Sequence, residues 1–292
     1  MPSSHRSVSS CAAGNGRLAG AGAGLWPGEP ASEEVCAAGV GVGGADPSVV
    51  TEKDLAALPA TVQRYLHAMG VVNRPRDWSF QAHITGRFRL RRQGSWMPAE
   101  GWQYNSALEV ARIFHMRIDF AGLVPMVGRD TYVGGRGITH RKLLGLVTVV
   151  HTHGPETDLS ELVTYLNDAV LMAPSMLLRP NTSFAPVDDH SFDVTLVDAG
   201  QTVTARVFLG DDGRPVNFST TDRYADLPGG LVRAQWTTPI DGWQPDGDRF
   251  IFTRGSAIWN LPEGPLSYLD FSMSPGDVRY NVAPADISPS SS

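Results

Sequence analysis

The chain has 292 residues, of which 42% are hydrophobic and 18% are charged, as in globular proteins with a substantial core. Its formal net charge of -6 argues against nucleic acid or an anionic membrane surface as the main partner, because both attract basic proteins. The two cysteines, Cys11 and Cys36, lie near the N-terminus, so the remainder has neither a disulfide framework nor a thiolate metal site.

Residues 1–48 are rich in Gly, Ala and Ser and have no periodic apolar pattern. Such a segment buries too little apolar surface to offset the entropy lost on ordering. We therefore predict a disordered leader over 1–48, one β domain over 49–284 and a disordered tail over 285–292. No secretory h-region and no run of the ~20 apolar residues that a membrane helix needs is present, so we expect a cytoplasmic protein without stable membrane insertion.

The domain opens with a short helical region. Thr51 is a suitable cap for a first turn, and Pro59 suits the first position of a second helix. Gly70 is a suitable C-terminal stop. The apolar residues at helical spacing are Leu58, Val62, Leu66 and Met69.

From residue 78 onward, apolar and polar residues alternate, which predicts half-buried strands. The apolar positions of the first strand are Trp78, Phe80, Ala82, Ile84, Phe88 and Leu90. The same pattern recurs at Phe114, Met116, Ile118 and Phe120. Gly134 and Gly135 predict a hairpin turn, followed by strands over 138–144 and 146–151.

One long helix interrupts the strands. Asp158 and Glu161 resemble a capping box, with Asp158 as the N-cap. Pro174 either ends the helix or starts another short turn. Its apolar stripe consists of Leu159, Leu162, Leu166 and Val170. A second, polar stripe consists of Glu161, Thr164, Tyr165 and Asp168, and it faces either a cavity or solvent.

Further strands complete a mainly β, α+β fold with about ten strands and helices only at the start and in the middle. This order predicts a strongly curved antiparallel sheet, either closed into a barrel or left as a half-barrel with helices packed across its open mouth. Both alternatives place an apolar cavity inside the sheet. The later strands are predicted over 192–196, 203–207, 216–221, 231–238, 249–259, 266–274 and 278–282.

Several motifs resemble an uncharacterised bacterial family of unknown function. They are VGRDTYVGGRG at 127–137, LLGLV at 143–147, GPE at 154–156, LVTYLNDAVLMAPSMLL at 162–178, DRY at 222–224 and TRGSAIWNLPEGPLSY at 253–268. The resemblance covers roughly residues 58–281. The family's architecture is similar to the half-barrel of bacterial lipoprotein carriers, which implies a hydrophobic ligand by analogy.

The first functional hypothesis is a protein that binds or carries an apolar small molecule, such as an acyl chain or an isoprenoid. Arg223, in the DRY motif, is a candidate for binding a carboxylate or phosphate, although an Asp/Arg pair at a sheet edge is more often structural. The predicted apolar ligand-binding residues are Trp78, Phe80, Phe88, Phe114 and Met116.

The alternative is a cofactor-independent enzyme, such as a cyclase, an isomerase or a hydrolase. Asp168 stands directly before an apolar run, where burial would raise its pKa and suit it to acid–base catalysis. Tyr165 and Asn167 are its predicted partners, and all three are candidate catalytic residues.

His151 and His153 share one face of a strand, with Glu156 and Asp158 nearby, which is a possible arrangement for zinc or iron. A solvent-exposed strand end explains the same residues, and we expect no metal. The chain lacks a Gly-x-Ser-x-Gly elbow, a phosphate loop and a dinucleotide fingerprint. We therefore expect no cofactor, and no nucleic acid as partner.

Overall fold

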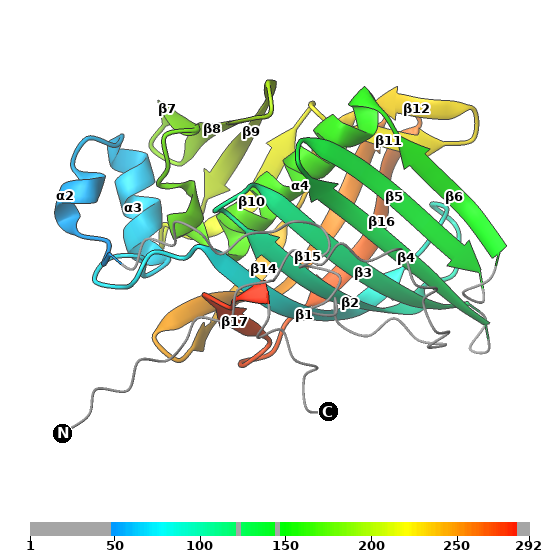
Figure 1. Ribbon diagram of the computed structural model, residues 1–292, viewed down its shortest axis with the longest axis horizontal. Coiled ribbons are helices and arrows are strands. Elements are labelled where there is room, and N and C mark those ends of the chain that lie inside the picture. The colour runs from blue at the N-terminus through cyan, green and yellow to red at the C-terminus, as the bar shows by residue number, and fades with distance from the viewer. Residues whose placement is uncertain (1–47, 121–123, 144–146, 285–292) are drawn as a thin grey trace, which may run out of the picture.

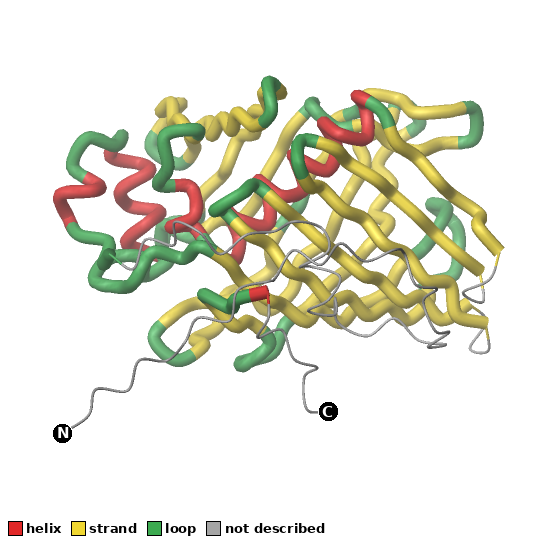
Figure 2. Tube along the Cα trace, in the orientation of Figure 1, coloured by secondary structure: helices red, strands yellow, loops and turns green. Residues whose placement is uncertain are grey.

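The computed structural model describes residues 48–120, 124–143 and 147–284. Only Ser48 of the leader predicted over 1–48 falls within these ranges, and the tail predicted over 285–292 lies outside them. Strands dominate the described part, together with three α-helices and one short 3-10 helix (Figures 1 and 2). No helix in these ranges is both long and apolar enough to cross a membrane.

The first half of the sheet is an antiparallel meander in which each strand pairs with the next along the chain. Gly134 and Gly135, with φ angles of 59° and 78°, form the predicted turn between two of these strands. The strands are β1 (Ser79–Phe88), β2 (Met97–Ser106), β3 (Ala111–Phe120), β4 (Val124–Val133), β5 (Arg136–Leu143) and β6 (Val147–His153).

The second half of the sheet joins the first where β1 pairs with β16. Its strands are β7 (Thr182–Asp188), β8 (Ser191–Asp198), β9 (Gln201–Leu209), β10 (Pro215–Thr220), β13 (Gln235–Thr237), β14 (Ile240–Asp246), β15 (Arg249–Leu261), β16 (Gly264–Ser272) and β17 (Val278–Tyr280). A separate hairpin consists of β11 (Tyr224–Leu227) and β12 (Gly230–Arg233).

The strand order along the sheet is β6-β5-β4-β3-β2-β1-β16-β15-β13-β10-β9-β8-β7, with β14 added on β15 and β17 on β1. The sheet is therefore curved and antiparallel but not closed into a barrel, which confirms the predicted fold class.

Helix α4 (Pro155–Met172) lies inside the curve of the sheet (Figure 1). It contacts β3, β4, β5 and β6 on one side and β9, β10 and β15 on the other. Glu161, Thr164 and Asp168 are therefore buried, and the alternative of a solvated polar face is wrong. The 3-10 helix η1 (Pro174–Leu177) follows at once, as the proline predicts.

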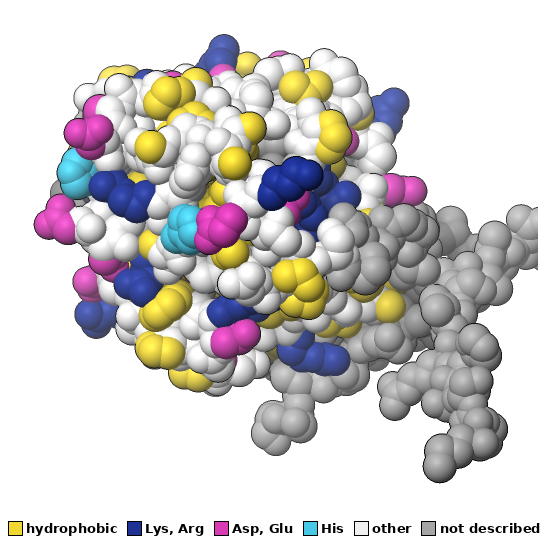
Figure 3. All heavy atoms as spheres, turned by 90° about the vertical axis from the view of Figure 1, so that its left-hand side faces the viewer, with side chains coloured by type: hydrophobic (Ala, Val, Ile, Leu, Met, Phe, Trp, Pro, Cys, Tyr) yellow, Lys and Arg dark blue, Asp and Glu magenta, His cyan; other side chains and the backbone are white. Residues whose placement is uncertain are grey.

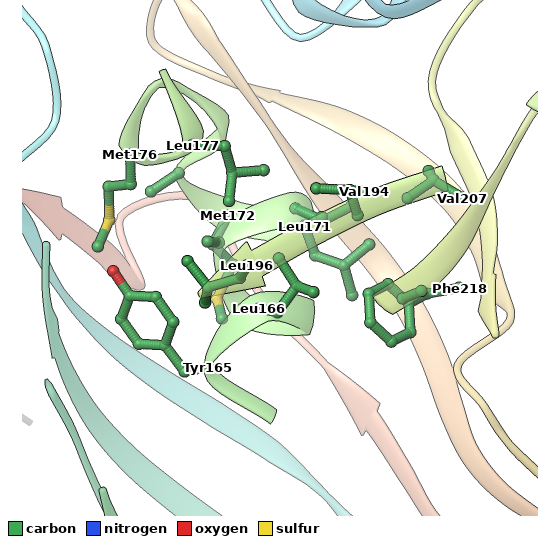
Figure 4. Close-up of a cluster of buried hydrophobic side chains, with 14 of the residues drawn as sticks. Tyr165, Leu166, Leu171, Met172, Met176, Leu177, Val194, Leu196, Val207 and Phe218 are labelled. Atoms are coloured by element: carbon green, nitrogen blue, oxygen red, sulfur yellow. The ribbon is translucent and has the colours of Figure 1, made fainter. Parts of the chain in front are cut away.

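The apolar side of α4 forms the centre of the core. Figure 4 shows Leu166, Leu171 and Met172 of the helix packed among side chains from β8, β9 and β10. Each such side chain stabilises the fold by roughly 1.5–3 kcal/mol when fully buried. The strand residues of this cluster in Figure 4 are Val194, Leu196, Val207 and Phe218.

The start of α4 differs from the prediction. The helix begins at Pro155 and its N-cap is Gly154, so Asp158 lies inside the first turn. Asp158 Oδ1 instead accepts a hydrogen bond of 2.6 Å from the backbone N–H of Gly137 on β5. A Cβ atom at Gly137 would lie 2.5 Å from the carbonyl oxygen of Thr157, so only glycine permits this close approach of strand and helix.

The N-terminal helices α2 (Glu52–Leu55) and α3 (Ala60–Ala68) pack at one end of the sheet, with α3 on β7 and β8. Thr51 caps α2 as predicted, and Gly70 ends α3 with φ of 69°. Pro59 is the N-cap of α3 rather than its first residue. Figure 3 shows this end of the molecule, where basic and acidic side chains are interspersed and form no single basic patch.

Two hairpin ends from opposite halves of the sheet touch each other. The hydroxyl of Tyr132 on β4 donates to Asp198 Oδ2 on β8 at 2.7 Å. The Gln201 side chain donates to the carbonyl oxygen of Gly135 at 2.8 Å. These contacts hold the two halves together around α4.

Candidate functional site

The site is built around a buried cluster of charges between β3 and α4. Arg112 of β3 donates from Nε to Asp168 Oδ2 at 2.7 Å and from a terminal nitrogen to Glu161 Oε2 at 3.0 Å. The three side chains are 5%, 11% and 6% exposed, respectively. One guanidinium thus bridges two carboxylates that lie two turns apart on α4.

Asp168 also accepts hydrogen bonds from β2. Gln103 donates to Oδ2 at 2.6 Å and Asn105 to the same oxygen at 3.4 Å. Alternate residues of a strand share one face, and Asn105 pairs in register with Arg112, so these donors converge on one point of the helix. Burial raises the pKa of Asp168, while Arg112 and the two amides oppose that shift.

Glu161 has weaker partners. The Thr139 hydroxyl is 3.5 Å from Oε1, and Arg112 is its ion-pair partner. Burial, followed by the nearby charge of Asp130, raises the pKa of Glu161 to about 7. Its charge therefore changes near neutral pH, and general acids and bases share this property.

A first cavity of about 130 Å³ lies between α4 and the concave face of the sheet. Its volume is close to the roughly 150 Å³ of an apolar cavity known to hold benzene. The charged cluster forms one part of its lining, through Arg112 and Asp168. The larger apolar side chains around it are Phe88, Phe114, Met116, Leu171, Met172, Phe252, Leu269 and Phe271.

A second cavity of about 180 Å³ adjoins the first and includes Glu161, Thr139 and Thr157. The boundary between the two cavities is largely polar. The residues that line both are Phe88, Asp130, Arg141, Arg223 and Tyr268.

Arg223 is held in place by aromatic side chains. Its guanidinium lies 4.0 Å from the ring centre of Trp236 and 5.3 Å from that of Trp259, within the range of cation–π attraction. One terminal nitrogen donates to the Tyr268 hydroxyl at 3.2 Å, and the indole N–H of Trp236 donates to the same oxygen at 3.1 Å.

The structure brings most of the predicted site residues to these cavities. Phe88, Phe114, Met116, Arg223, Asn167 and Asp168 all line the first cavity. Asn167 donates to the Thr238 hydroxyl at 2.7 Å rather than to Asp168.

Three predicted residues lie elsewhere. Phe80 is fully buried in the core, Trp78 is half-buried before β1, and neither lines a described cavity. Tyr165 is also in the core, and Figure 4 shows its ring on the side of η1, directed toward Met176. The hydrogen-bond donors to the Asp168 carboxylate come from β2 and β3 rather than from Tyr165.

Sequence reasoning missed Arg112 and Arg141, while Asp130 lies in the VGRDTYVGGRG motif but was not selected as a site residue. Arg112 lies on the inward face two residues before Phe114, and a strand pattern extended back to residue 111 would have placed it there. Asp130 pairs in register with Phe114, and Arg141 with Gly128. The pattern that could have indicated this site is therefore a charged residue at an inward position of each of the neighbouring strands β3, β4 and β5.

His151 and His153 are exposed on β6, and their rings lie 5.4 Å apart. The His140 ring lies 5.3 Å from that of His151. Within residues 48–120, 124–143 and 147–284, no group of three or more His, Cys, Asp or Glu side chains is arranged to hold a metal ion.

The sequence matches one protein family, described as a family of unknown function (DUF6544), over residues 48–271. No curated protein matches it.

Three solved structures are similar to this chain. A LolA superfamily protein from Nitrosomonas europaea has a TM-score of 0.40 and 16% identity, covering 77% of this chain and 96% of that one. A DUF1329 family protein from Desulfovibrio piger has a TM-score of 0.40 and 11% identity, covering 77% and 93%. A putative outer membrane lipoprotein-sorting protein domain from Vibrio parahaemolyticus has a TM-score of 0.38 and 11% identity, covering 70% and 86%.

Proposed function

We propose a function for this chain, which belongs to the DUF6544 family of unknown function: it binds an apolar small molecule between α4 and the concave face of the sheet. An acyl chain or an isoprenoid unit is the chemical class that suits a lining of aromatic, Leu and Met side chains.

The observation that carries this proposal is the first cavity. Protein interiors are close-packed, and a space of about 130 Å³ beside large side chains leaves those side chains without contacts on one side. The charged cluster of Arg112, Glu161 and Asp168 is hydrogen-bonded within the protein, so it does not need a charged group of the ligand as a partner. An apolar molecule would restore the missing contacts.

The test is calorimetric titration with 1-decanol, after extraction of co-purified lipid and its identification by mass spectrometry. Ala99 lines the first cavity from β2, and Ala99→Leu places three further carbon atoms in that space. We expect binding by the wild type and a loss of about tenfold or more in affinity for Ala99→Leu.

Ala60→Leu is the matched control, because Ala60 is exposed at the start of α3. It should bind 1-decanol like the wild type, and melting curves show whether both variants fold. An absence of binding by the wild type, or equal binding by Ala99→Leu, would contradict the proposal.

A second candidate function is cofactor-independent catalysis, and one observation favours it. Glu161 lines the second cavity with a pKa of about 7, whereas Asp168 is held by three side-chain donors. If the bound compound is converted, Glu161→Gln should lower the rate by on the order of 10²–10⁴ while binding persists. Asp168→Asn is the comparison, and an equal rate in Glu161→Gln and wild type would exclude this role for Glu161.

A further inference from the structure

The second cavity contains polar atoms without partners. Buried polar groups in proteins are nearly always hydrogen-bonded, so a concentration of exceptions calls for an explanation. Within the described part of the chain, four residues that line this cavity each have a buried polar side-chain atom that makes no hydrogen bond. These atoms are Asp130 Oδ1, Arg141 Nε, Thr157 Oγ1 and Arg223 Nε.

The charges around this cavity favour an anion. Arg112 is already paired with Glu161 and Asp168, but neither Arg141 nor Arg223 has a carboxylate within ion-pairing distance among the described residues. Of the three carboxylates that line this cavity, Glu161 is paired with Arg112 and Asp226 is exposed, so Asp130 is the remaining carboxylate beside these two guanidinium groups. Guanidinium groups bind carboxylate and phosphate oxygens through paired, charge-assisted hydrogen bonds.

The position of these groups fits a ligand with two different ends. Arg141 and Arg223 line both cavities, so a headgroup between them lies next to the apolar lining of the first cavity. Arg223 is held between aromatic rings and the Tyr268 hydroxyl while its Nε has no partner. Its guanidinium is therefore already oriented before a ligand arrives, which reduces the entropy cost of binding.

We propose that the ligand is a single-chain amphiphile whose anionic headgroup, a carboxylate or a phosphate monoester, is held by Arg141 and Arg223 in the second cavity while its chain occupies the first. This inference rests on the proposed function, because it assigns a headgroup to the same apolar ligand. The two cavities, of about 130 Å³ and about 180 Å³, suit a ligand of modest chain length.

The experiment compares four ligands that share one chain: decanoate, decyl phosphate, 1-decanol and decylamine. Each is titrated calorimetrically into the full chain at pH 7, below the concentration at which micelles form. We expect decanoate or decyl phosphate to bind about tenfold or more tightly than 1-decanol, and decylamine to bind most weakly. The anion that binds more tightly shows whether the site prefers a carboxylate or a phosphate headgroup.

Variants locate the headgroup. Arg141→Gln and Arg223→Gln should each weaken binding of the anion by about tenfold while changing 1-decanol affinity by less than about threefold. Arg254→Gln is the matched control, because Arg254 is exposed and pairs with the exposed Asp241. It should leave all four affinities unchanged.

The outcomes separate the two proposals. If 1-decanol binds as tightly as both anions, or decylamine binds best, the anionic headgroup is refuted while apolar binding stands. If Arg254→Gln weakens the anion as much as the two cavity variants do, the assigned position is refuted. If none of the four ligands binds, both proposals fail. The ligand series on the wild type decides the headgroup even where a variant does not fold.

Discussion

Arg112 Nε lies 2.7 Å from Asp168 Oδ2, and this ion pair joins β3 of the sheet to helix α4. Both side chains are buried, and the same guanidinium also contacts Glu161 at 3.0 Å. A buried ion pair contributes little net stability when intact, but removal of one partner leaves a charge without compensation.

Arg112→Met should lower the free energy of unfolding by about 3–5 kcal/mol, because it leaves two buried carboxylates without their cation. Arg254→Gln removes an exposed ion pair and should cost at most about 1 kcal/mol. Urea unfolding of both variants measures the difference. A loss below about 1 kcal/mol for Arg112→Met would show that the cluster is solvated or rearranges.

Glu161 should make stability depend on pH. Its pKa rises from an ordinary 4.5 to about 7 on folding, because of burial and the charges of Asp130 and Asp168, while Arg112 and Arg223 oppose the shift. Between these values the folded protein keeps a proton that the unfolded chain releases, so the free energy of unfolding falls as pH rises. The expected loss is on the order of 3 kcal/mol between pH 4 and pH 8.

Glu161→Gln cannot titrate at this position and should lack that loss. The measurement is the difference between wild-type and variant unfolding free energies across the pH range, which cancels the titration of most other groups. Parallel profiles for the two proteins would contradict the assignment.

Tyr132→Phe should lower the free energy of unfolding by about 1–3 kcal/mol, because it leaves the half-buried Asp198 carboxylate without its donor. Tyr224→Phe is the control, since its hydroxyl makes no hydrogen bond within the described residues. Hydrogen exchange at the β4–β5 and β8–β9 turns should become faster only in Tyr132→Phe. Unchanged exchange there would mean that this contact does not hold the two halves together.

A chain that begins at Ser48 should keep the melting transition of the full chain. A chain that begins at Thr51 should lose stability, because Val50 is fully buried and its backbone exchanges hydrogen bonds with Asn73 and Arg74. Burial of one Val side chain is worth roughly 1.5–3 kcal/mol. Calorimetric melting of the three proteins gives the comparison, and a large loss already at Ser48 would show that residues 1–47 pack on the domain.

Local pattern alone determined much of the fold. Alternation identified β1 and the part of β3 from Phe114 onward, and Gly134–Gly135 identified the β4–β5 hairpin, because a two-residue turn with positive φ needs glycine. The same pattern placed Phe88, Phe114 and Met116 on the inward face, and the structure shows all three at the first cavity. These features depend only on neighbours along the chain.

Tertiary structure decided the rest. The segment of β2 contains Pro98 and Gly101, which disfavour a strand, and it is held as one because β1 and β3 pair with it on both sides. No local pattern shows that Arg112 reaches Asp168, since 56 residues separate them along the chain. The polar stripe of α4 is buried because the sheet bends around the helix and supplies a cation and two amides at that point. The local pattern determines which residues share one face of a strand or helix. Which of these faces pack together, and therefore which buried charges are paired, is decided by the tertiary structure.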